Sequence, residues 1–319
     1  MDGIPTDDRP GRTCPLSYRY PANVFNRPPS LSADVLYVVG GLYGNLPALD
    51  ALSMLAAREA KPPLIVFNGD FNWFNRDAAS FAAINKRVLE HVALRGNVET
   101  ELAGEDSGAG CGCGYPDDVS DTEVERSNAI LQELRETART YPAIRARLEA
   151  LPMHEVVQVG AARVGIVHGD AESLAGWGFA HDQLDDPANR RWLKKVFAES
   201  GVDVFASSHT CLPALRSFEF DGAPRIIVNN GAAGMPNFQG IQAGMITRIA
   251  IAPLPGEALF GVSTNGTYVD AVQLPYDAAR WENEFLSNWP AGSPGHLSYF
   301  QRIRQGPRFT PGQAFARPA

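Results

Sequence analysis

The sequence predicts a layered α/β fold with mixed β-sheet pairing. Short apolar runs rich in β-branched residues alternate with segments whose apolar residues recur at helical spacing, which is typical of strands alternating with helices. Two adjacent runs, "HEVVQV" and "ARVGIV", flank Gly160 and predict a hairpin, which adds antiparallel pairing. The chain has 319 residues, 45% of them hydrophobic, so one large domain or two small ones could form a sizeable core.

The N-terminal half divides into an arm and the start of a domain predicted to span residues 33–274. Residues 1–32 are rich in proline and arginine and show no period, so we expect an extended arm that wraps the domain. The run "DVLYVV" at 34–39 predicts a buried strand. Asn45 as a cap and Pro47 in the first turn then predict a helix. A strand at 64–67, a helix near 77–91 and a short strand at 92–95 are expected next.

A glycine-rich stretch interrupts this pattern in the middle of the chain. Residues 101–120, which include Cys111-Gly-Cys113, predict a loop or small lid inserted in the domain. Residues 121–150 have a helical pattern that is interrupted at Pro142. Elements expected after the hairpin are a helix near 185–199, strands at 202–206, 225–229, 245–250 and 267–273, and a tail, 275–319, with one helix around Trp281 followed by irregular chain.

Composition excludes several classes of protein. The net charge of −8 argues against nucleic acid as the main partner, since such proteins usually have a basic face. No apolar run approaches the roughly 18 residues that span a bilayer, and the first residues lack the apolar segment of a signal peptide. Four cysteines do not form the framework of a small disulfide-rich domain. We therefore expect a cytoplasmic protein without a membrane partner.

Four apolar runs each end in a potential metal ligand. "LIVFNGD" ends at Asp70, "HVALRGN" at Asn97, "RVGIVHGD" contains His168, and "VDVFASSHT" contains His209. Strand ends in α/β folds open onto one edge of the sheet, so these side chains could converge. A carboxylate, an amide oxygen and two imidazoles suit Mn, Fe or Zn better than Ca or Mg. Taken singly, each residue could equally be a turn residue or a helix cap.

The order of these motifs, Gly-Asp, Gly-Asn, His and then His-x-x, resembles the calcineurin-like metallophosphoesterase family. "YGNLPALDAL" at 43–52 resembles the opening segment of that family, and "VNNGAAG" at 228–234 resembles its late "NPGS"-type turn. The resemblance covers residues 34 to 250 or so. It implies a four-layered α/β/β/α sandwich with mixed sheets, which carries two metal ions bridged by an aspartate.

The resemblance also implies roles for individual residues. Asp70 takes the bridging position, Asn97 the Gly-Asn position, His168 that of the isolated histidine, and His209 the first histidine of Gly-His-x-His. These four form the complete protein ligand set of one of the family's two sites. The cofactor implied is a divalent transition metal, Mn, Fe or Zn.

The second site of the family has lost its usual ligands in this sequence. Gly41 and Tyr43 stand where the family has Asp-x-His, Cys211 replaces the last histidine of Gly-His-x-His, and Val98 replaces the histidine that faces the substrate phosphate. Tyr43 and Cys211 could hold an atypical second ion together with Asp70, or they could pack as ordinary buried residues.

Three further residues are candidates for substrate binding. Arg95 precedes the Gly-Asn motif and could bind a phosphate bidentately, although a surface ion pair is the alternative. Asn45 and Asn229 lie on turns that would face the cleft, although both could be turn or cap residues.

The resemblance implies a metal-dependent hydrolase of phosphoesters, either phosphodiesters, phosphomonoesters or pyrophosphates, that uses a metal-bound hydroxide. Its partner would be a small phosphorylated substrate or a nucleotide. No residue is assigned as the catalytic acid, so we expect slow turnover or a leaving group of low pKa. One alternative is a catalytically impaired protein of the same fold that binds a nucleotide or a phosphorylated partner. The other is a thiol-based redox or metal-handling protein that uses Cys111, Cys113 and Cys211.

Overall fold

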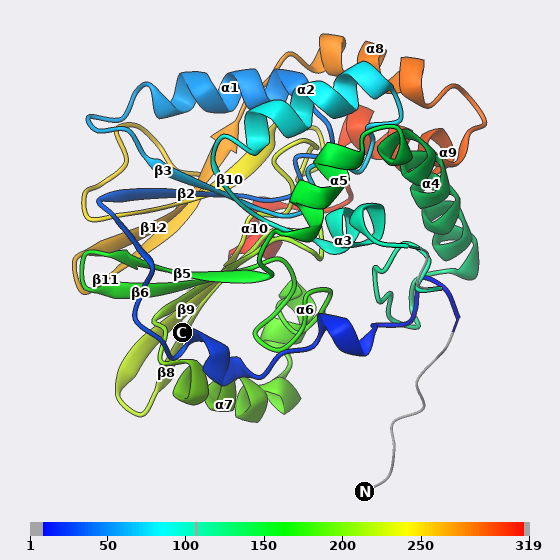
Figure 1. Cartoon of the computed structure of the whole chain (residues 1–319). Coiled ribbons are helices and arrows are strands. Elements are labelled where there is room, and N and C mark those ends of the chain that lie inside the picture. Colours follow the sequence, from blue (N-terminus) through cyan, green and yellow to red (C-terminus); the bar gives the residue numbers. More distant parts are fainter. Residues whose placement is uncertain (1–8, 106–107, 316–319) are drawn as a thin grey trace, which may run out of the picture.

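The computed structural model describes residues 9–105 and 108–315, and within them two six-stranded sheets lie face to face with helices outside (Figure 1). The first sheet has the strand order β11-β12-β10-β2-β3-β4, and the second has the order β1-β5-β6-β7-β9-β8. The strands are β1 (Leu31–Ala33), β2 (Val35–Val39), β3 (Leu64–Asn68), β4 (Val92–Leu94), β5 (His154–Val159), β6 (Ala162–Val167), β7 (Val204–Ser207), β8 (Ala214–Phe220), β9 (Ala223–Asn229), β10 (Gly244–Ala250), β11 (Phe260–Thr264) and β12 (Thr267–Leu274).

Both sheets are mixed, as the sequence predicts. In the first sheet, β2, β3 and β4 are parallel, whereas β10, β11 and β12 pair antiparallel. In the second sheet, β6, β7 and β9 are parallel, and hairpins add β5 and β8. The α-helices are α1 (Leu46–Ala56), α2 (Ala78–Val88), α3 (Asn97–Ala103), α4 (Asp121–Arg139), α5 (Pro142–Glu149), α6 (His181–Asp185), α7 (Arg190–Ser200), α8 (Ala278–Asn288), α9 (Pro294–Gln305) and α10 (Pro311–Ala314), and the 3₁₀ helices are η1 (Leu16–Tyr18), η2 (Ala22–Phe25) and η3 (Pro187–Asn189).

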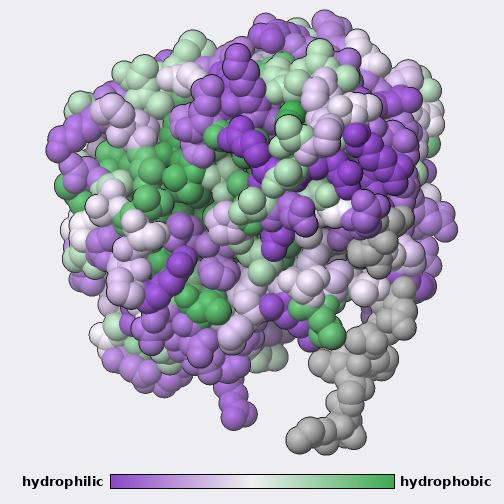
Figure 2. Space-filling view, in the orientation of Figure 1, coloured by the Kyte–Doolittle hydropathy of each residue, from purple (hydrophilic) through white to green (hydrophobic). Residues whose placement is uncertain are grey.

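Three apolar layers hold the sandwich together, and they confirm the predicted four-layered α/β/β/α arrangement. Val66 on β3 and Ile166 on β6 belong to the core between the two sheets. Helices α1, α2 and α8 cover the outer face of the first sheet, whereas α7 lies on the second sheet (Figure 1), where Phe197 packs against Phe205. Figure 2 shows a largely hydrophilic face with several hydrophobic areas, the broadest of them over the part of the molecule where the sheets lie in Figure 1.

Most of the elements expected from the sequence are present. The hairpin β5–β6 turns at Gly160, and the Asn45 side chain caps α1 by accepting a hydrogen bond of 2.8 Å from the backbone N–H of Ala48. Strands β1, β8 and β11 are additional to the prediction. β1 has only three residues, too few for an alternating pattern to be seen, whereas β8 has seven and includes the charged residues Arg216 and Glu219, which interrupt its apolar run.

Two predictions about irregular segments are wrong in detail. The predicted loop 101–120 begins inside helix α3, because Glu99 in the first turn satisfies the backbone N–H of Gly96 and so favours a helix. The described part of the tail after Trp281 contains the helices α9 and α10 between irregular stretches, while residues 316–319 lie outside the described residues. In α9, Ser293 caps the helix by accepting from the backbone N–H of His296, and Pro294 stands at the first position.

The arm and the tail both pack on the domain, while the division at residues 33 and 274 stays a prediction. In the arm, residues 1–8 lie outside the described residues, and Tyr18 and Phe25 are buried. The Tyr20 hydroxyl donates a hydrogen bond of 2.8 Å to the carbonyl of Asp170. No helix in the described ranges is both long enough and apolar enough to cross a membrane.

Arg248 anchors a buried ionic cluster on the helix-covered face of the first sheet. Its side chain is 1% exposed and donates to the Glu59 carboxylate at 2.6 and 3.2 Å, while Asp270 lies 3.4 Å away.

We predict that Arg248→Met lowers the free energy of unfolding by about 3–5 kcal/mol, because two carboxylates lose their buried counter-charge. The exposed pair Lys61–Asp34 offers the control, and Lys61→Met is expected to leave the free energy of unfolding nearly unchanged. Urea unfolding of both variants measures the difference, and equal costs would contradict the prediction.

Candidate metal centre

The four predicted metal ligands lie where neighbouring strands of the two sheets end. Asp70 follows β3 and Asn97 opens α3 just after β4, both in the first sheet. His168 follows β6 and His209 follows β7, both in the second sheet. The Asn68 side chain ties the two sheets together here by donating to the carbonyl of Val167 at 2.8 Å. All four predicted ligands are buried, with 6% exposure or less.

The structure brings these four side chains together around one point. His168 Nε2 lies 3.0 Å from Asn97 Oδ1, 3.1 Å from His209 Nδ1 and 3.4 Å from Asp70 Oδ2. One potential ligand atom from each of Asp70, His168 and His209 lies within 4.8 Å of the others. The Asp-His-His group is therefore compact enough to share one ion, with the Asn97 oxygen at its side.

Backbone carbonyls determine which ring nitrogens face this point. His168 Nδ1 lies 2.9 Å from the carbonyl oxygen of Asn68, and His209 Nε2 lies 2.9 Å from that of Cys113. A carbonyl oxygen only accepts, so each of these nitrogens carries the hydrogen. Neutral rings then turn unprotonated nitrogens, His168 Nε2 and His209 Nδ1, toward each other at 3.1 Å. Two facing lone pairs repel each other unless a cation lies between them.

Asn97 and Asp70 add two more electron-pair donors to the same point. Asn97 Nδ2 donates to the carbonyl of Cys111 at 2.9 Å, which leaves Asn97 Oδ1 directed at His168. Donor atoms bound at about 2.0–2.2 Å from a transition metal are themselves spaced about 3.0–3.5 Å apart. The measured separations around His168 Nε2 match this spacing, and the mixed oxygen and nitrogen set fits Mn, Fe or Zn.

The pKa shifts of the site residues also indicate that the site favours one positive charge. Burial opposes protonation of His168, but the Asp70 carboxylate outweighs this and raises the pKa of the ring. Burial and the neighbouring His168 lower the pKa of His209 to about 3, so that ring is neutral. Burial would raise the pKa of Asp70, but His168 and His209 lower it, so the carboxylate is ionised. A single cation at this point would offset the charge of Asp70 and the repulsion between the two imidazole lone pairs.

Close backbone approach explains why glycine precedes both Asp70 and Asn97. A Cβ atom on Gly96 would lie 2.2 Å from Asp70 Oδ1, and one on Gly69 would lie 2.6 Å from His168 Nδ1. Asp70 itself has φ of 53°, a conformation that costs energy outside glycine and that aims its carboxylate into the site. The Gly-Asp and Gly-Asn motifs therefore have a steric cause.

Glu99 supports the site and was not identified from the sequence. Its fully buried carboxylate accepts hydrogen bonds from the backbone N–H groups of Gly96, Asp70, Phe71 and Asn72 at 3.0, 2.7, 3.0 and 3.2 Å. Burial and the nearby Asp70 raise its pKa to about 7, against the lowering effect of these donors. Glu99 thereby joins the loop that carries Asp70 to the start of α3. Its only sequence signal is a glutamate two residues after the Gly-Asn motif.

The Cys111-Gly-Cys113 segment supports the site through backbone carbonyls that orient two of the ligands, rather than through its thiols. The carbonyls of Cys111 and Cys113 orient Asn97 and His209, respectively, and the Cys113 carbonyl also accepts from Trp177 Nε1 at 3.1 Å. All four cysteines are free. Burial raises the pKa of the Cys113 and Cys211 thiols, which keeps them in the less nucleophilic protonated form.

Tyr43 and Cys211 contact each other where the resemblance places a second ion. The Tyr43 hydroxyl lies 2.8 Å from the Cys211 sulfur, and both residues have positive φ, 53° and 60°. Burial raises the pKa of both groups, so a phenol and a thiol form a neutral hydrogen-bonded pair. The segment at 43–52 therefore still begins with a turn, but this turn supplies no charged metal ligand.

The three predicted substrate contacts are not brought to the site. Arg95 donates to the carbonyl of Glu149 at 3.3 Å and is absent from the cavity wall. Asn45 caps α1 and donates to the carbonyl of Gly234 at 2.9 Å, both inside the protein. Asn229 donates to Thr210 Oγ1 at 3.0 Å and accepts from the backbone N–H of Gly231. The structure therefore uses these residues to hold turns together.

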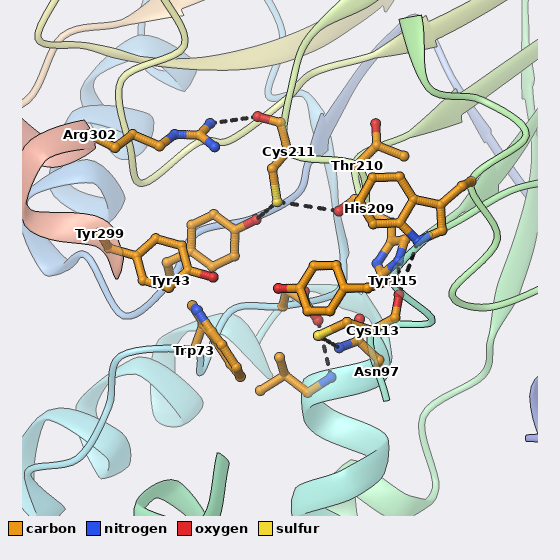
Figure 3. A pocket seen from close by; sticks show the side chains of 13 residues that line it. Tyr43, Trp73, Asn97, Cys113, Tyr115, His209, Thr210, Cys211, Tyr299 and Arg302 are labelled. Atoms are coloured by element: carbon orange, nitrogen blue, oxygen red, sulfur yellow. Dashed lines mark hydrogen bonds between the residues drawn. The ribbon is translucent and has the colours of Figure 1, made fainter. Parts of the chain in front are cut away.

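A cavity of about 170 Å³ opens beside the candidate metal ligands (Figure 3). Five residues that line this cavity were not identified from the sequence, namely Trp73, Tyr115, Trp177, Tyr299 and Arg302. Tyr299 and Arg302 come from α9, in the tail that was expected to be irregular. The complete lining is Tyr43, Asp70, Trp73, Asn97, Val98, Cys113, Tyr115, Trp177, His209, Thr210, Cys211, Tyr299 and Arg302.

Comparison with solved structures finds the same fold. The chain is similar to a metallophosphoesterase from Sphaerobacter thermophilus, with a TM-score of 0.53 and 16% identity over 85% of this chain and 99% of that one. It is also similar to a hypothetical protein from Pyrococcus horikoshii OT3, with a TM-score of 0.57 and 15% identity over 86% and 99% of the two chains. No family model and no curated protein matches the sequence. The chain therefore has the metallophosphoesterase fold, with a buried Asp-His-His group compatible with a divalent metal.

We predict that Mn²⁺ or Zn²⁺ stabilises the protein against thermal unfolding and that a chelator reverses the effect. At an ion concentration 100 times Kd, the free energy of unfolding is expected to rise by about 2.7 kcal/mol. His168→Ala should remove the gain, because it deletes the atom that lies closest to the other ligand atoms. His91→Ala, at an exposed position before β4, should keep it. Equal metal-induced shifts in both variants would contradict the ligand assignment.

A second prediction concerns Glu99. Glu99→Gln places an amide NH₂ against backbone N–H groups, and each unsatisfied buried donor costs about 1–3 kcal/mol. We expect lower stability in urea and metal affinity reduced about 10- to 100-fold, as for other groups that orient metal ligands. The exposed Glu105 is the matched control, and Glu105→Gln should change neither quantity. Unchanged metal affinity in Glu99→Gln would refute its role.

Proposed function

We propose that this protein is a metal-dependent hydrolase of phosphoesters that works with one ion held by Asp70, Asn97, His168 and His209. The observation that carries the proposal is the convergence of four lone-pair donors on one buried point beside a cavity. Structural neighbours with the metallophosphoesterase fold support it. The implied partner is a small phosphorylated compound, because the cavity is small and partly enclosed.

The reaction is a substitution at phosphorus by water. A P–O bond forms to the water oxygen, the P–O bond to the leaving group breaks, the water loses a proton and the leaving oxygen gains one. A divalent ion in this site would lower the pKa of a water and offset negative charge on the phosphoryl oxygens. Asp70 and Asn97 would hold it from one sheet, and His168 and His209 from the other.

Residues of the chain set the conditions for this chemistry. The carbonyls of Asn68 and Cys113 keep His168 and His209 in the tautomers that present lone pairs to the ion. Val98 lines the cavity where the family has a histidine, so the leaving group would take its proton from water or from a group not yet assigned. We therefore expect faster hydrolysis of esters whose leaving groups have a low pKa.

A second candidate function is binding of a phosphorylated ligand without hydrolysis. The neutral Tyr43–Cys211 contact favours this function, because it lies where a second ion would bind. Without that ion, the site lacks the pair of metals that stabilises the attacking and leaving oxygens in two-metal enzymes. The thiol-based alternative has less support, because burial keeps the thiols of Cys113 and Cys211 protonated.

Metal analysis combined with hydrolysis of nitrophenyl phosphate esters tests the proposal. We expect one ion per chain and metal-dependent turnover, with kcat/KM lowered by at least about 10²-fold in His168→Ala and unchanged in His91→Ala. One bound ion without turnover on monoesters, diesters or pyrophosphate would favour the binding function. Metal content that depends on Cys111 and Cys113 thiols rather than on His209 would favour the thiol-based alternative.

A further inference from the structure

Arg302 reaches the cavity from α9, on the side where Tyr43 and Cys211 lie. Figure 3 shows its guanidinium above Tyr43 and beside the loop that carries Cys211. Its Nη2 donates to the carbonyl of Cys211 at 2.5 Å, and its Nε donates to the carbonyl of Pro236 at 3.4 Å. These bonds position the group, and Nη1 has no hydrogen-bond partner among the described residues, so part of the guanidinium is available to a ligand.

The charge of Arg302 is not neutralised by the protein. Within the described ranges, both of its hydrogen bonds go to carbonyl oxygens and no carboxylate pairs with it. Two buried arginines elsewhere do have acidic partners, Arg248 with Glu59 and Arg216 with Asp185. Arg302 is half-buried and partly shielded from water, so an anion that enters the cavity would find an unpaired cation there.

The cavity as a whole has an excess of positive charge once a divalent ion is bound. Among its described lining residues, Asp70 is the only carboxylate and Arg302 the only arginine or lysine. A divalent ion at Asp70 leaves one net positive charge there, and Arg302 adds a second across the cavity. Two separated positive charges match a dianion better than a singly charged anion.

We propose that Arg302 is the second cationic anchor for the phosphoryl group and that the substrate is a phosphate monoester dianion. This inference rests on the proposed hydrolase function. The guanidinium lies on the side of the cavity where a two-metal site would hold its second ion. Its remaining N–H groups can donate to phosphoryl oxygens. It cannot activate water, so it binds and offsets charge only.

The remaining walls indicate the kind of organic group that the phosphate carries. Trp73, Tyr115 and Tyr299 present aromatic surface to the cavity (Figure 3). The volume of about 170 Å³ is below the roughly 300–1,000 Å³ typical of pockets for drug-sized ligands. One compact apolar or aromatic substituent fits such a space, whereas a diester must place two substituents around the same phosphorus.

Phosphate binding tests the anchor without relying on turnover. Isothermal titration calorimetry with inorganic phosphate would compare the wild type with Arg302→Met and Arg302→Lys, in metal-loaded and metal-free protein. We expect Arg302→Met to weaken binding at least 10-fold in both forms, and Arg302→Lys to recover part of the loss through its charge. Arg304→Met is the control, because Arg304 lies on the same helix, is exposed and pairs with Glu282. Wild-type affinity in Arg302→Met, or no phosphate binding by the wild type, would overturn the anchor.

Two further measurements separate this inference from the proposed function. Urea unfolding of each variant shows whether Arg302→Met folds, and the Arg302→Lys data stand in its place if it does not. The wild type should hydrolyse 4-nitrophenyl phosphate with a higher kcat/KM than bis(4-nitrophenyl) phosphate, and Arg302→Met should lower the first value at least 10-fold more than the second. Metal-dependent hydrolysis that favours the diester would refute the monoester inference and leave the hydrolase. Phosphate binding that depends on Arg302 without hydrolysis of either ester would refute the hydrolase and leave the anchor.

Discussion

The structure depends on four electron-pair donors that face one buried point and repel one another unless a proton or a metal ion lies between them. Asp70 brings a charge, Asn97 an oxygen, and His168 and His209 the nitrogens that their backbone partners leave unprotonated. Such a group is repulsive by itself. It persists because the ends of strands in both sheets, whose cores are closely packed, fix the positions from which the side chains extend.

The elements around the site serve this convergence through backbone groups more than through side chains. Glu99 collects four N–H groups and so joins the loop of Asp70 to α3, while the Cys111-Gly-Cys113 segment directs two carbonyls at Asn97 and His209. The Glu99 carboxylate can titrate, with its pKa raised to about 7, but backbone carbonyls and amides neither titrate nor change charge. Orientation by such groups therefore keeps the ligands in place whatever the protonation state of the thiols nearby.

The two sides of the cavity differ in how they supply positive charge. One side has the ligand set for an ion, and the other has a neutral Tyr43–Cys211 pair with Arg302 above it. A guanidinium differs from a metal ion in that it lowers no water pKa, but it forms directed hydrogen bonds to oxygen. The fold thus combines one potential metal centre with one fixed organic cation.

The sequence by itself determined the layered α/β class, the hairpin at Gly160 and the residue types at four strand ends, because period and strand-terminal glycines are local signals. It also predicted that Asp70, Asn97, His168 and His209 converge, and the structure brings them together from the strand ends of two sheets rather than from one edge of a single sheet. Only the tertiary structure decided that Arg95 points elsewhere and that Arg302, from a tail expected to be irregular, lines the cavity. These outcomes depend on packing between segments far apart in the chain, and neither local propensity nor spacing records which distant segment will lie beside a strand end.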